Sequence, residues 1–253
     1  MPLQKMTYRT KTILSGKYLE VEMYPIFTGQ KNGRSKKIKP SSNKQKNLND
    51  KNAKKKIIRL IHNNFEEGDL MITLSYKEKS RPKTEEQAKK DIDNYLRRIR
   101  RYRQKNNLPE LKYIAVIEYR EEEEGKKIRM HHHLIMNSMN RDEAEKIWGL
   151  GRANTMRLEE DENGLEGITR YIIKDPRGKK RVKQSRNLIT PIPNIKDNEY
   201  TKRTINKFIK DIDRQAYFER KYKKFQYIDS QVIVNDITGV SVTVKMKKFN
   251  NSD

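Results

Sequence analysis

The stretch Met130-His-His-His-Leu-Ile-Met136 decides the predicted fold, because it places three of the chain's four histidines side by side in an apolar run. Apolar residues on both sides of the histidines are typical of a buried strand. Successive side chains of a strand point to opposite faces, so His131 and His133 share one face and His132 lies on the other. Two imidazoles at this spacing fit around one divalent ion. Adjacent histidines on an edge strand, or an incidental metal-binding tract, are the alternative.

The residues before this stretch predict its partner strand. Residues 112–120 read as a strand, followed by a charged hairpin loop that contains Gly125. If the turn centres on Glu124 and Gly125, Glu118 lies directly opposite His131 on the same face. Taken alone, Glu118 is more simply a solvated strand residue.

One carboxylate and two imidazoles then converge: Glu118, His131 and His133. Two neutral nitrogens with one hard oxygen and open positions suit Mn²⁺ or Mg²⁺ acting on a phosphate, although Zn²⁺ binds the same ligands. We therefore predict a divalent metal as cofactor, without identifying the metal.

Apolar periodicity predicts five further core elements. They are a strand over 69–76, a long helix over 84–102, a helix over 141–148, a strand over 153–158 and a helix over 164–175. With the hairpin, this order indicates an α+β fold with a central antiparallel sheet of the split βαβ type, as in ferredoxin-like and RNA-recognition folds.

The helix over 164–175 carries the sequence Gly167-Ile-Thr-Arg-Tyr171-Ile-Ile-Lys174. Tyr171 and Lys174 are three residues apart and therefore share a helical face, with Gly167 one turn earlier. A missing side chain at Gly167 lets a nucleic-acid backbone approach closely. A tyrosine hydroxyl has a pKa of roughly 10 and needs help to attack a phosphodiester, which a metal ion and Lys174 would give. The plainer interpretation is that Tyr171 caps a core, as helical tyrosines often do.

Composition points to a polyanionic partner. Lys and Arg number 58 against 34 Asp and Glu, a formal net charge of +24. Nucleic acid explains this balance better than a membrane surface, because there is no long apolar run and no lipidation signal. The absence of cysteine excludes disulfides, thiolate zinc sites and cysteine nucleophiles, and is consistent with the cytoplasm.

The chain length of 253 residues favours one core with appendages. We expect an N-terminal extension over 1–66, a core over 67–190 and a basic C-terminal extension with a helix and a strand over 191–253. The N-terminal extension contains a mobile basic linker over about 30–56, then a helix. This linker is equally compatible with a solubilising tether and a DNA-contacting arm.

The strand over 69–76, the histidine strand and the tyrosine helix together resemble the HUH endonuclease superfamily, specifically the rolling-circle replication initiators of small phages and plasmids. The resemblance covers roughly 69–187 and rests on Ile72-Thr-Leu-Ser-Tyr76, His131-His-His133 and Tyr171-Ile-Ile-Lys174 in that order. It implies that His131, His133 and Glu118 hold the ion. It also implies that Tyr171 takes the 5′-phosphate at a nick and that Lys174 positions DNA.

The resemblance further implies single-stranded origin DNA, either linear or folded as a hairpin, as a partner, together with a helicase and polymerase of the bacterial host. The chain has no phosphate-cradling Gly-rich loop and no second tyrosine in the helix, so a helicase domain and a two-tyrosine cycle are not expected. The predicted DNA contacts are two strand hydroxyls and the basic residues on and after the tyrosine helix: Thr73, Ser75, Arg170, Arg177, Lys179, Lys180, Arg181, Lys183 and Arg186.

Two rival functions fit parts of this pattern. A non-catalytic nucleic-acid-binding module of similar fold would stack bases on sheet aromatics such as Tyr113 and Tyr119. A transposase or relaxase would use the same nicking chemistry at a different recognition site. Metal-dependent cleavage separates the first rival from the initiator, and only the recognised DNA separates the second.

Overall fold

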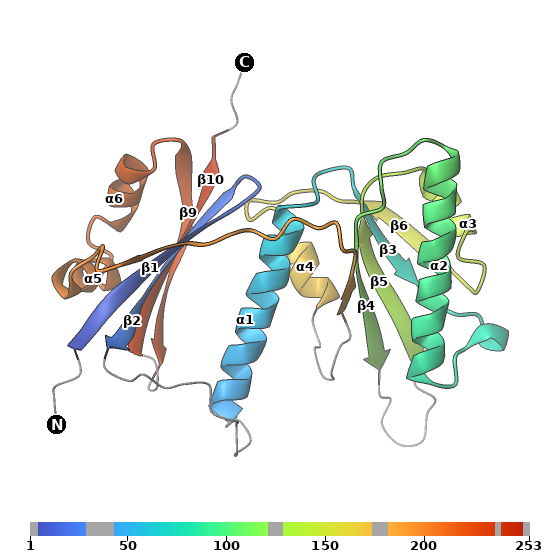
Figure 1. The fold of residues 1–253 in the computed structure, drawn as a ribbon, viewed down its shortest axis with the longest axis horizontal. Coiled ribbons are helices and arrows are strands. Elements are labelled where there is room, and N and C mark those ends of the chain that lie inside the picture. Colours follow the sequence, from blue (N-terminus) through green and yellow to red (C-terminus); the bar gives the residue numbers. More distant parts are fainter. Residues whose placement is uncertain (1–4, 29–42, 121–128, 174–181, 236–238, 250–253) are drawn as a thin grey trace. The chain divides into compact units, whose positions relative to one another are not determined.

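The computed structural model describes residues 5–28, 43–120, 129–173, 182–235 and 239–249 (Figure 1). The chain forms two compact units, one made of residues 1–49 with 190–253 and the other of residues 50–189. Each unit contains its own five-stranded sheet. No helix in these ranges is long and apolar enough to cross a membrane.

The sheet of the second unit has the strand order β6-β3-β5-β4-β7, and every pairing is antiparallel. Its strands are β3 (Leu70–Leu74), β4 (Tyr113–Arg120), β5 (Arg129–Met136), β6 (Ala153–Arg157) and β7 (Val182–Gln184). The histidine strand β5 is therefore central, with β3 on one side and β4 on the other. This arrangement confirms the predicted α+β fold with a central antiparallel sheet.

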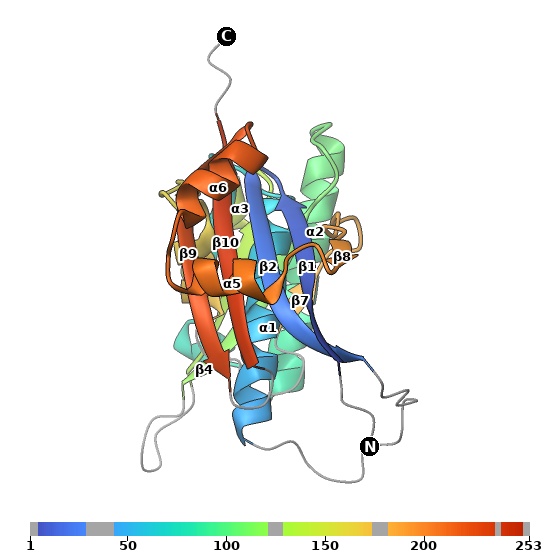
Figure 2. The same ribbon diagram turned by 90° about the vertical axis from the view of Figure 1, so that its left-hand side faces the viewer.

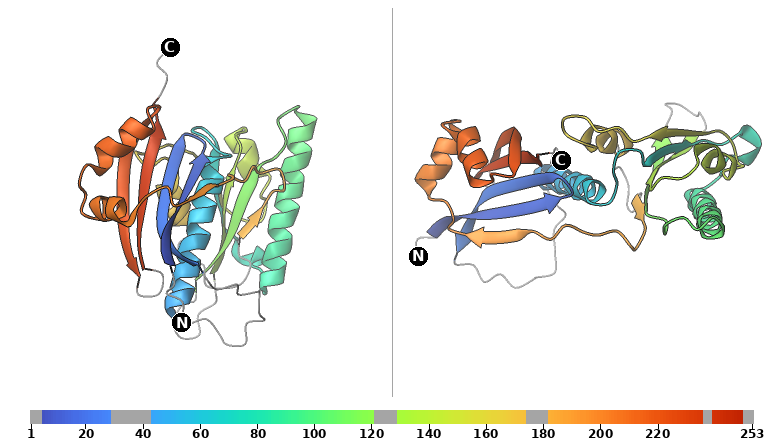
Figure 3. Two further views of the ribbon diagram at one scale, coloured as in Figure 1. Left: turned by 60° about the vertical axis from the view of Figure 1, so that its left-hand side comes forward. Right: turned by 90° about the horizontal axis from the view of Figure 1, so that it is seen from above.

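One face of this sheet is covered by α2 (Glu85–Lys105), which runs along the strands (Figure 3). The helix begins where the Thr84 side chain accepts a hydrogen bond from the backbone N–H of Gln87, which satisfies a donor of the first turn. Its apolar stripe packs against alternate strand residues and the buried Trp148, which follows α3 (Arg141–Lys146). Alternation along the strands therefore assigns Leu134 and His132 of β5 to this face.

The opposite face is covered by residues from α1 (Asn43–His62) and α4 (Glu166–Ile172). Leu60 and Ile61 of α1 and Ile172 of α4 are buried against Ile114 and Ile135 of the sheet. Ile114 of β4 and Ile135 of β5 thus lie on the same face as α4. Every second residue of each strand shares this face, including Glu118, His131 and His133. This is the face that holds the predicted site.

The first unit has the strand order β8-β1-β2-β10-β9, with α5 (Lys202–Ile209) and α6 (Arg214–Lys221) packed on one face (Figure 2). Its strands are β1 (Lys5–Ser15), β2 (Tyr18–Thr28), β8 (Asn194–Asp197), β9 (Phe225–Asn235) and β10 (Gly239–Lys248). Val21 pairs with Val244, which joins the N-terminal and C-terminal parts of the chain in one sheet. The two regions expected to be separate extensions thus share a hydrophobic core.

The prediction of a mobile basic linker over about 30–56 is wrong for residues 43–56, because α1 begins at Asn43, and its part before residue 43 lies outside the described residues. Lys, Gln, Leu and Ala in this stretch are good helix formers, and the apolar residues of the last turns anchor the helix to the sheet. The second unit begins at residue 50, whereas the core was expected to begin at residue 67.

Candidate active site

His133 is held between the two strands that flank β5. Its Nε2 atom lies 2.8 Å from a carboxylate oxygen of Glu118 on β4, and its Nδ1 atom lies 3.3 Å from the Thr73 hydroxyl on β3. The side chain of His133 is almost fully buried. Strand register accounts for the Thr73 contact, because Thr73 is paired directly with His133. The imidazole is therefore fixed at both nitrogens.

His131 lies on the same face as His133 and is directly opposite Glu118 in the register of β4 and β5. The predicted cross-strand position is thus confirmed. In the described part of the chain, no three His, Asp or Glu side chains are grouped in an arrangement that could hold a metal ion. The donor types nevertheless fit a divalent ion, since a carboxylate oxygen already contacts an imidazole nitrogen and a second imidazole lies in register beside them.

His132 lies on the opposite face and is fully buried. Its Nε2 atom lies 2.7 Å from the Tyr76 hydroxyl, and its ring meets Trp148 edge-on. Burial, followed by the neighbouring His131 and His133, lowers the pKa of His132 to about 3. The middle histidine is therefore a neutral core residue, as strand alternation predicts.

Tyr171 lies beside His133 although the two are far apart in sequence. Their ring centroids are 5.7 Å apart, with the rings nearly perpendicular. Ile172 and Ile173 are buried in the core under α4, which leaves Tyr171 pointing outward with 57% of its surface exposed. The phenol is therefore accessible at the edge of the histidine site.

The other predicted residues lie in or near the site, at a separate pocket, or outside the described ranges. Thr73 joins the site through His133, whereas the Ser75 hydroxyl donates to the backbone carbonyl of Arg152 and Arg170 pairs with Glu166. Lys183 pairs with Asp93 and, with Arg186, lines a pocket beside α2. The remaining predicted residues lie outside the described ranges: Lys174, Arg177, Lys179, Lys180 and Arg181.

Two contacts were not predicted from the sequence. Thr73 was expected to meet DNA, but its hydroxyl contacts His133, and Tyr76 was not expected to bond His132. Thr73 lies in β3 and Tyr76 follows it, whereas both histidines lie in β5. These two strands are far apart in the sequence, so no local pattern fixes their register. Val182–Gln184, in the basic stretch after the tyrosine helix, forms the short edge strand β7.

Residues 69–176 match the family model described as replication-associated protein ORF2/G2P. The match begins next to β3 and extends past α4, so it includes Thr73, Glu118, both outer histidines and Tyr171. No curated protein and no solved structure matches the chain. The family match indicates a role in DNA replication.

Proposed function

Since residues 69–176 match the family model of replication-associated protein ORF2/G2P, we propose that this protein initiates rolling-circle replication by nicking single-stranded origin DNA with Tyr171. The observation that carries the proposal is the packing of the exposed Tyr171 ring against His133, which itself contacts Glu118. A phosphate placed between the phenol and these side chains would meet a nucleophile and a metal-ligating set together.

In the proposed step, the Tyr171 oxygen forms a bond to the phosphorus of the scissile phosphodiester. The bond from phosphorus to the 3′ oxygen breaks, the phenol loses its proton and the leaving 3′ oxygen gains one. The products are a 5′-phosphotyrosine and a free 3′-OH, which serves as primer. The ester conserves the energy of the broken bond, so a 3′-OH can reverse the step and rejoin the strand without a nucleotide cofactor.

The residues that would hold Mn²⁺ or Mg²⁺ are Glu118, His131 and His133. When bound, the ion would polarise the phosphate and offset its developing negative charge. The Glu118 carboxylate can only accept a hydrogen bond, so Nε2 of His133 carries the proton in this contact and Nδ1 accepts from the Thr73 hydroxyl. A bound ion would take the place of the Nε2 proton, and Nδ1–H would then donate to Thr73 and keep the ring oriented. Glu118 is already at that Nε2 atom.

The helix predicted over 164–175 ends at Ile172, and Lys174 lies outside the described residues. Lys174 follows Tyr171 by three residues in the sequence, and we assign it to neutralising the same phosphate. The basic residues predicted after it, from Arg177 to Arg181, would contact the flanking strand. A host helicase and polymerase would extend the primer. A transposase or relaxase would share every step and differ only in the DNA recognised.

The test is covalent capture. Purified protein is incubated with labelled single-stranded origin-region DNA and Mn²⁺, with and without EDTA, and protein–DNA adducts that survive denaturation are counted. We expect an EDTA-sensitive adduct that is lost in Tyr171→Phe and His133→Ala and kept in the control Tyr102→Phe. Binding without an adduct under any divalent metal would leave the non-catalytic binding module as the better account.

A further inference from the structure

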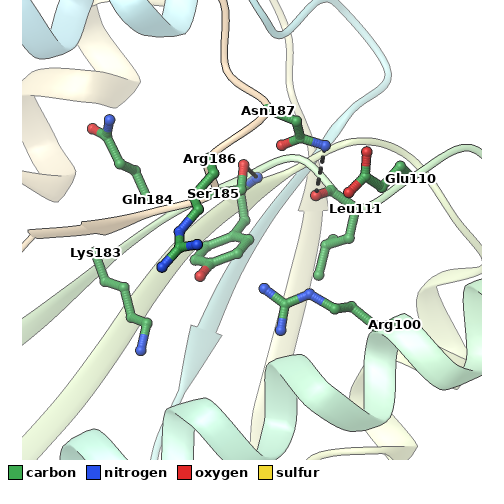
Figure 4. A pocket seen from close by; sticks show the side chains of 9 residues that line it. Arg100, Glu110, Leu111, Lys183, Gln184, Ser185, Arg186 and Asn187 are labelled. Carbon is green, nitrogen blue, oxygen red and sulfur yellow. Dashed lines mark hydrogen bonds between the residues drawn. The ribbon is translucent and has the colours of Figure 1, made fainter.

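A second polar site lies between α2 and the edge strand β7, in a cavity of about 500 Å³. Arg100 of α2 and Arg186, which follows β7, point towards the same space from opposite sides (Figure 4). Lys183 and Glu110 also line this cavity, which we call the α2–β7 pocket. Three of its lining residues are thus cationic and one is acidic.

The α2–β7 pocket is separate from the candidate active site. Tyr113 of β4 lines it and is buried with the apolar residues of α2. Ile114, the next residue, is buried with Ile172 of the tyrosine helix on the other face of the sheet. The pocket therefore lies on the face opposite Tyr171, where β7 ends the sheet.

The segment Ser185-Arg186-Asn187 is built to present its middle residue. The backbone N–H of Ser185 donates to the carbonyl of Tyr113, and the Ser185 hydroxyl accepts from the Tyr113 N–H. The Asn187 amide donates to the carbonyl of Leu111. Both neighbours of Arg186 are thus fixed to the start of β4, while Arg186 itself is exposed beside the cavity.

The two arginines of the α2–β7 pocket carry charge that the described residues do not neutralise. Lys183 pairs with Asp93, but within the described ranges neither Arg100 nor Arg186 has a carboxylate partner. The Arg100 guanidinium lies over the Tyr113 ring, 5.6 Å from its centroid, which orients it without cancelling its charge. Two guanidinium groups that face one cavity, one of them oriented by an aromatic ring, form a site for an anion, and their forked donors match phosphate oxygens.

We propose that the α2–β7 pocket binds a phosphodiester of the same DNA strand that is nicked, at a position away from the scissile bond. This inference rests on the proposed function only for the identity of the strand. Because β7 is an edge strand, a strand held at Tyr171 can pass the edge of the sheet to reach the opposite face. The pocket then holds the DNA in place independently of the chemistry.

Binding is measured by fluorescence anisotropy in EDTA, with Tyr171→Phe as the parent protein, so that no cleavage contributes. The pocket variant is Arg100→Ala with Arg186→Ala. Its matched control is Arg101→Ala with Arg152→Ala, which removes two exposed arginines that do not line the cavity. Each protein is titrated with a long origin-region strand and with a short strand that covers the nick site alone, over a series of salt concentrations.

We expect the pocket variant to lose about tenfold or more in affinity for the long strand, with the slope of log affinity against log salt reduced by about 1.4, the value for two single-strand phosphate contacts. The short strand should bind equally to both variants. Glu110→Gln should tighten binding of the long strand, which a folding defect would not do. Equal losses in the pocket variant and the control would overturn the proposal, because they would reflect only diffuse positive charge.

A second arm distinguishes a DNA phosphate from a free nucleotide. A fluorescent deoxynucleoside monophosphate is titrated into the parent protein and the pocket variant. Tight binding of the monophosphate that is lost in the variant, with unchanged binding of the long strand, would overturn the proposal in favour of a nucleotide site. Since no arm depends on adduct formation, a failed covalent capture experiment would leave this result interpretable.

Discussion

The Nε2 atom of His133 lies 2.8 Å from a carboxylate oxygen of Glu118, which joins the central strand β5 to β4 at the candidate metal site. The same imidazole meets the Thr73 hydroxyl at its other nitrogen and the Tyr171 ring at its edge. One histidine thus connects three strands and a helix. The proposed metal site and the proposed nucleophile are coupled through it.

Glu118→Gln should weaken metal binding while leaving the fold intact. The amide keeps the shape of the side chain but replaces an anionic oxygen ligand by a neutral one, which hard cations bind less tightly. We expect the Mn²⁺ concentration for half-maximal adduct formation to rise by at least about tenfold. Calorimetric titration with Mn²⁺ checks the affinity directly, with the exposed Glu159→Gln as control. Equal metal affinity in both variants would remove Glu118 from the ligand set.

Thr73→Val should lower metal affinity by about 10- to 100-fold, the range for residues that orient a ligating histidine. Valine is favoured in strands, so the free energy of unfolding should change by less than about 1 kcal/mol. The matched control is Ser75→Ala, whose hydroxyl donates to a backbone carbonyl and not to a histidine. If both variants bind Mn²⁺ like the parent, the Thr73 contact does not position His133.

Gly167→Ala should separate stability from activity. Gly167 is the second residue of α4, and alanine is favoured over glycine in helices by up to about 1 kcal/mol. The added Cβ would lie 3.1 Å from an Asp161 carboxylate oxygen, a side chain that is exposed and able to move. The melting temperature of Gly167→Ala should therefore equal or exceed that of the parent protein. Adduct formation should fall, since the methyl group obstructs DNA one turn before Tyr171, and unchanged adduct formation would show that DNA does not approach there.

Acidification should destabilise the protein through His132. Its pKa in the fold is about 3, against 6.5 when unperturbed, so the unfolded chain takes up a proton that the folded chain does not. The contribution of neutral His132 to the free energy of unfolding is fully present above pH 6.5. It is lost as the pH falls towards 3, by about 1.4 kcal/mol per pH unit. Urea unfolding between pH 7 and 4 measures it.

His132→Gln should remove this part of the pH dependence, whereas Tyr76→Phe should keep it, because Tyr76→Phe removes the hydrogen bond but not the titrating group. An equally steep loss of stability in His132→Gln would assign the acid sensitivity to other residues.

The parts of the site that were predicted from the sequence are local ones. The prediction of a turn at Glu124 and Gly125, which lie outside the described residues, correctly placed Glu118 opposite His131, because a hairpin fixes register over a few residues. The contact between Thr73 and His133 was not predicted, since these strands are separated by a long stretch of chain and either strand could slip. Alternation alone correctly separated His132 from its neighbours.

The first unit was harder to predict for the same reason. Its sheet is completed by pairing β2 near the N-terminus with β10 near the C-terminus, a contact that no local pattern encodes. β1, with Lys, Thr and Arg interspersed, has a weak apolar alternation, and β7 and β8 are only three and four residues long. Short edge strands are held by their neighbours' backbone rather than by their own side chains.

Identifying the residue that carries the DNA tests directly whether Tyr171 is the nucleophile. The adduct formed with labelled origin-region DNA and Mn²⁺ is trimmed with nuclease, digested with trypsin and sequenced by mass spectrometry. Cleavage after Arg170 and Lys174 isolates the peptide Tyr171-Ile-Ile-Lys174. We expect a nucleotide phosphate on Tyr171 in this peptide. A nucleotide on any other tyrosine, or an adduct that persists in Tyr171→Phe, would contradict it.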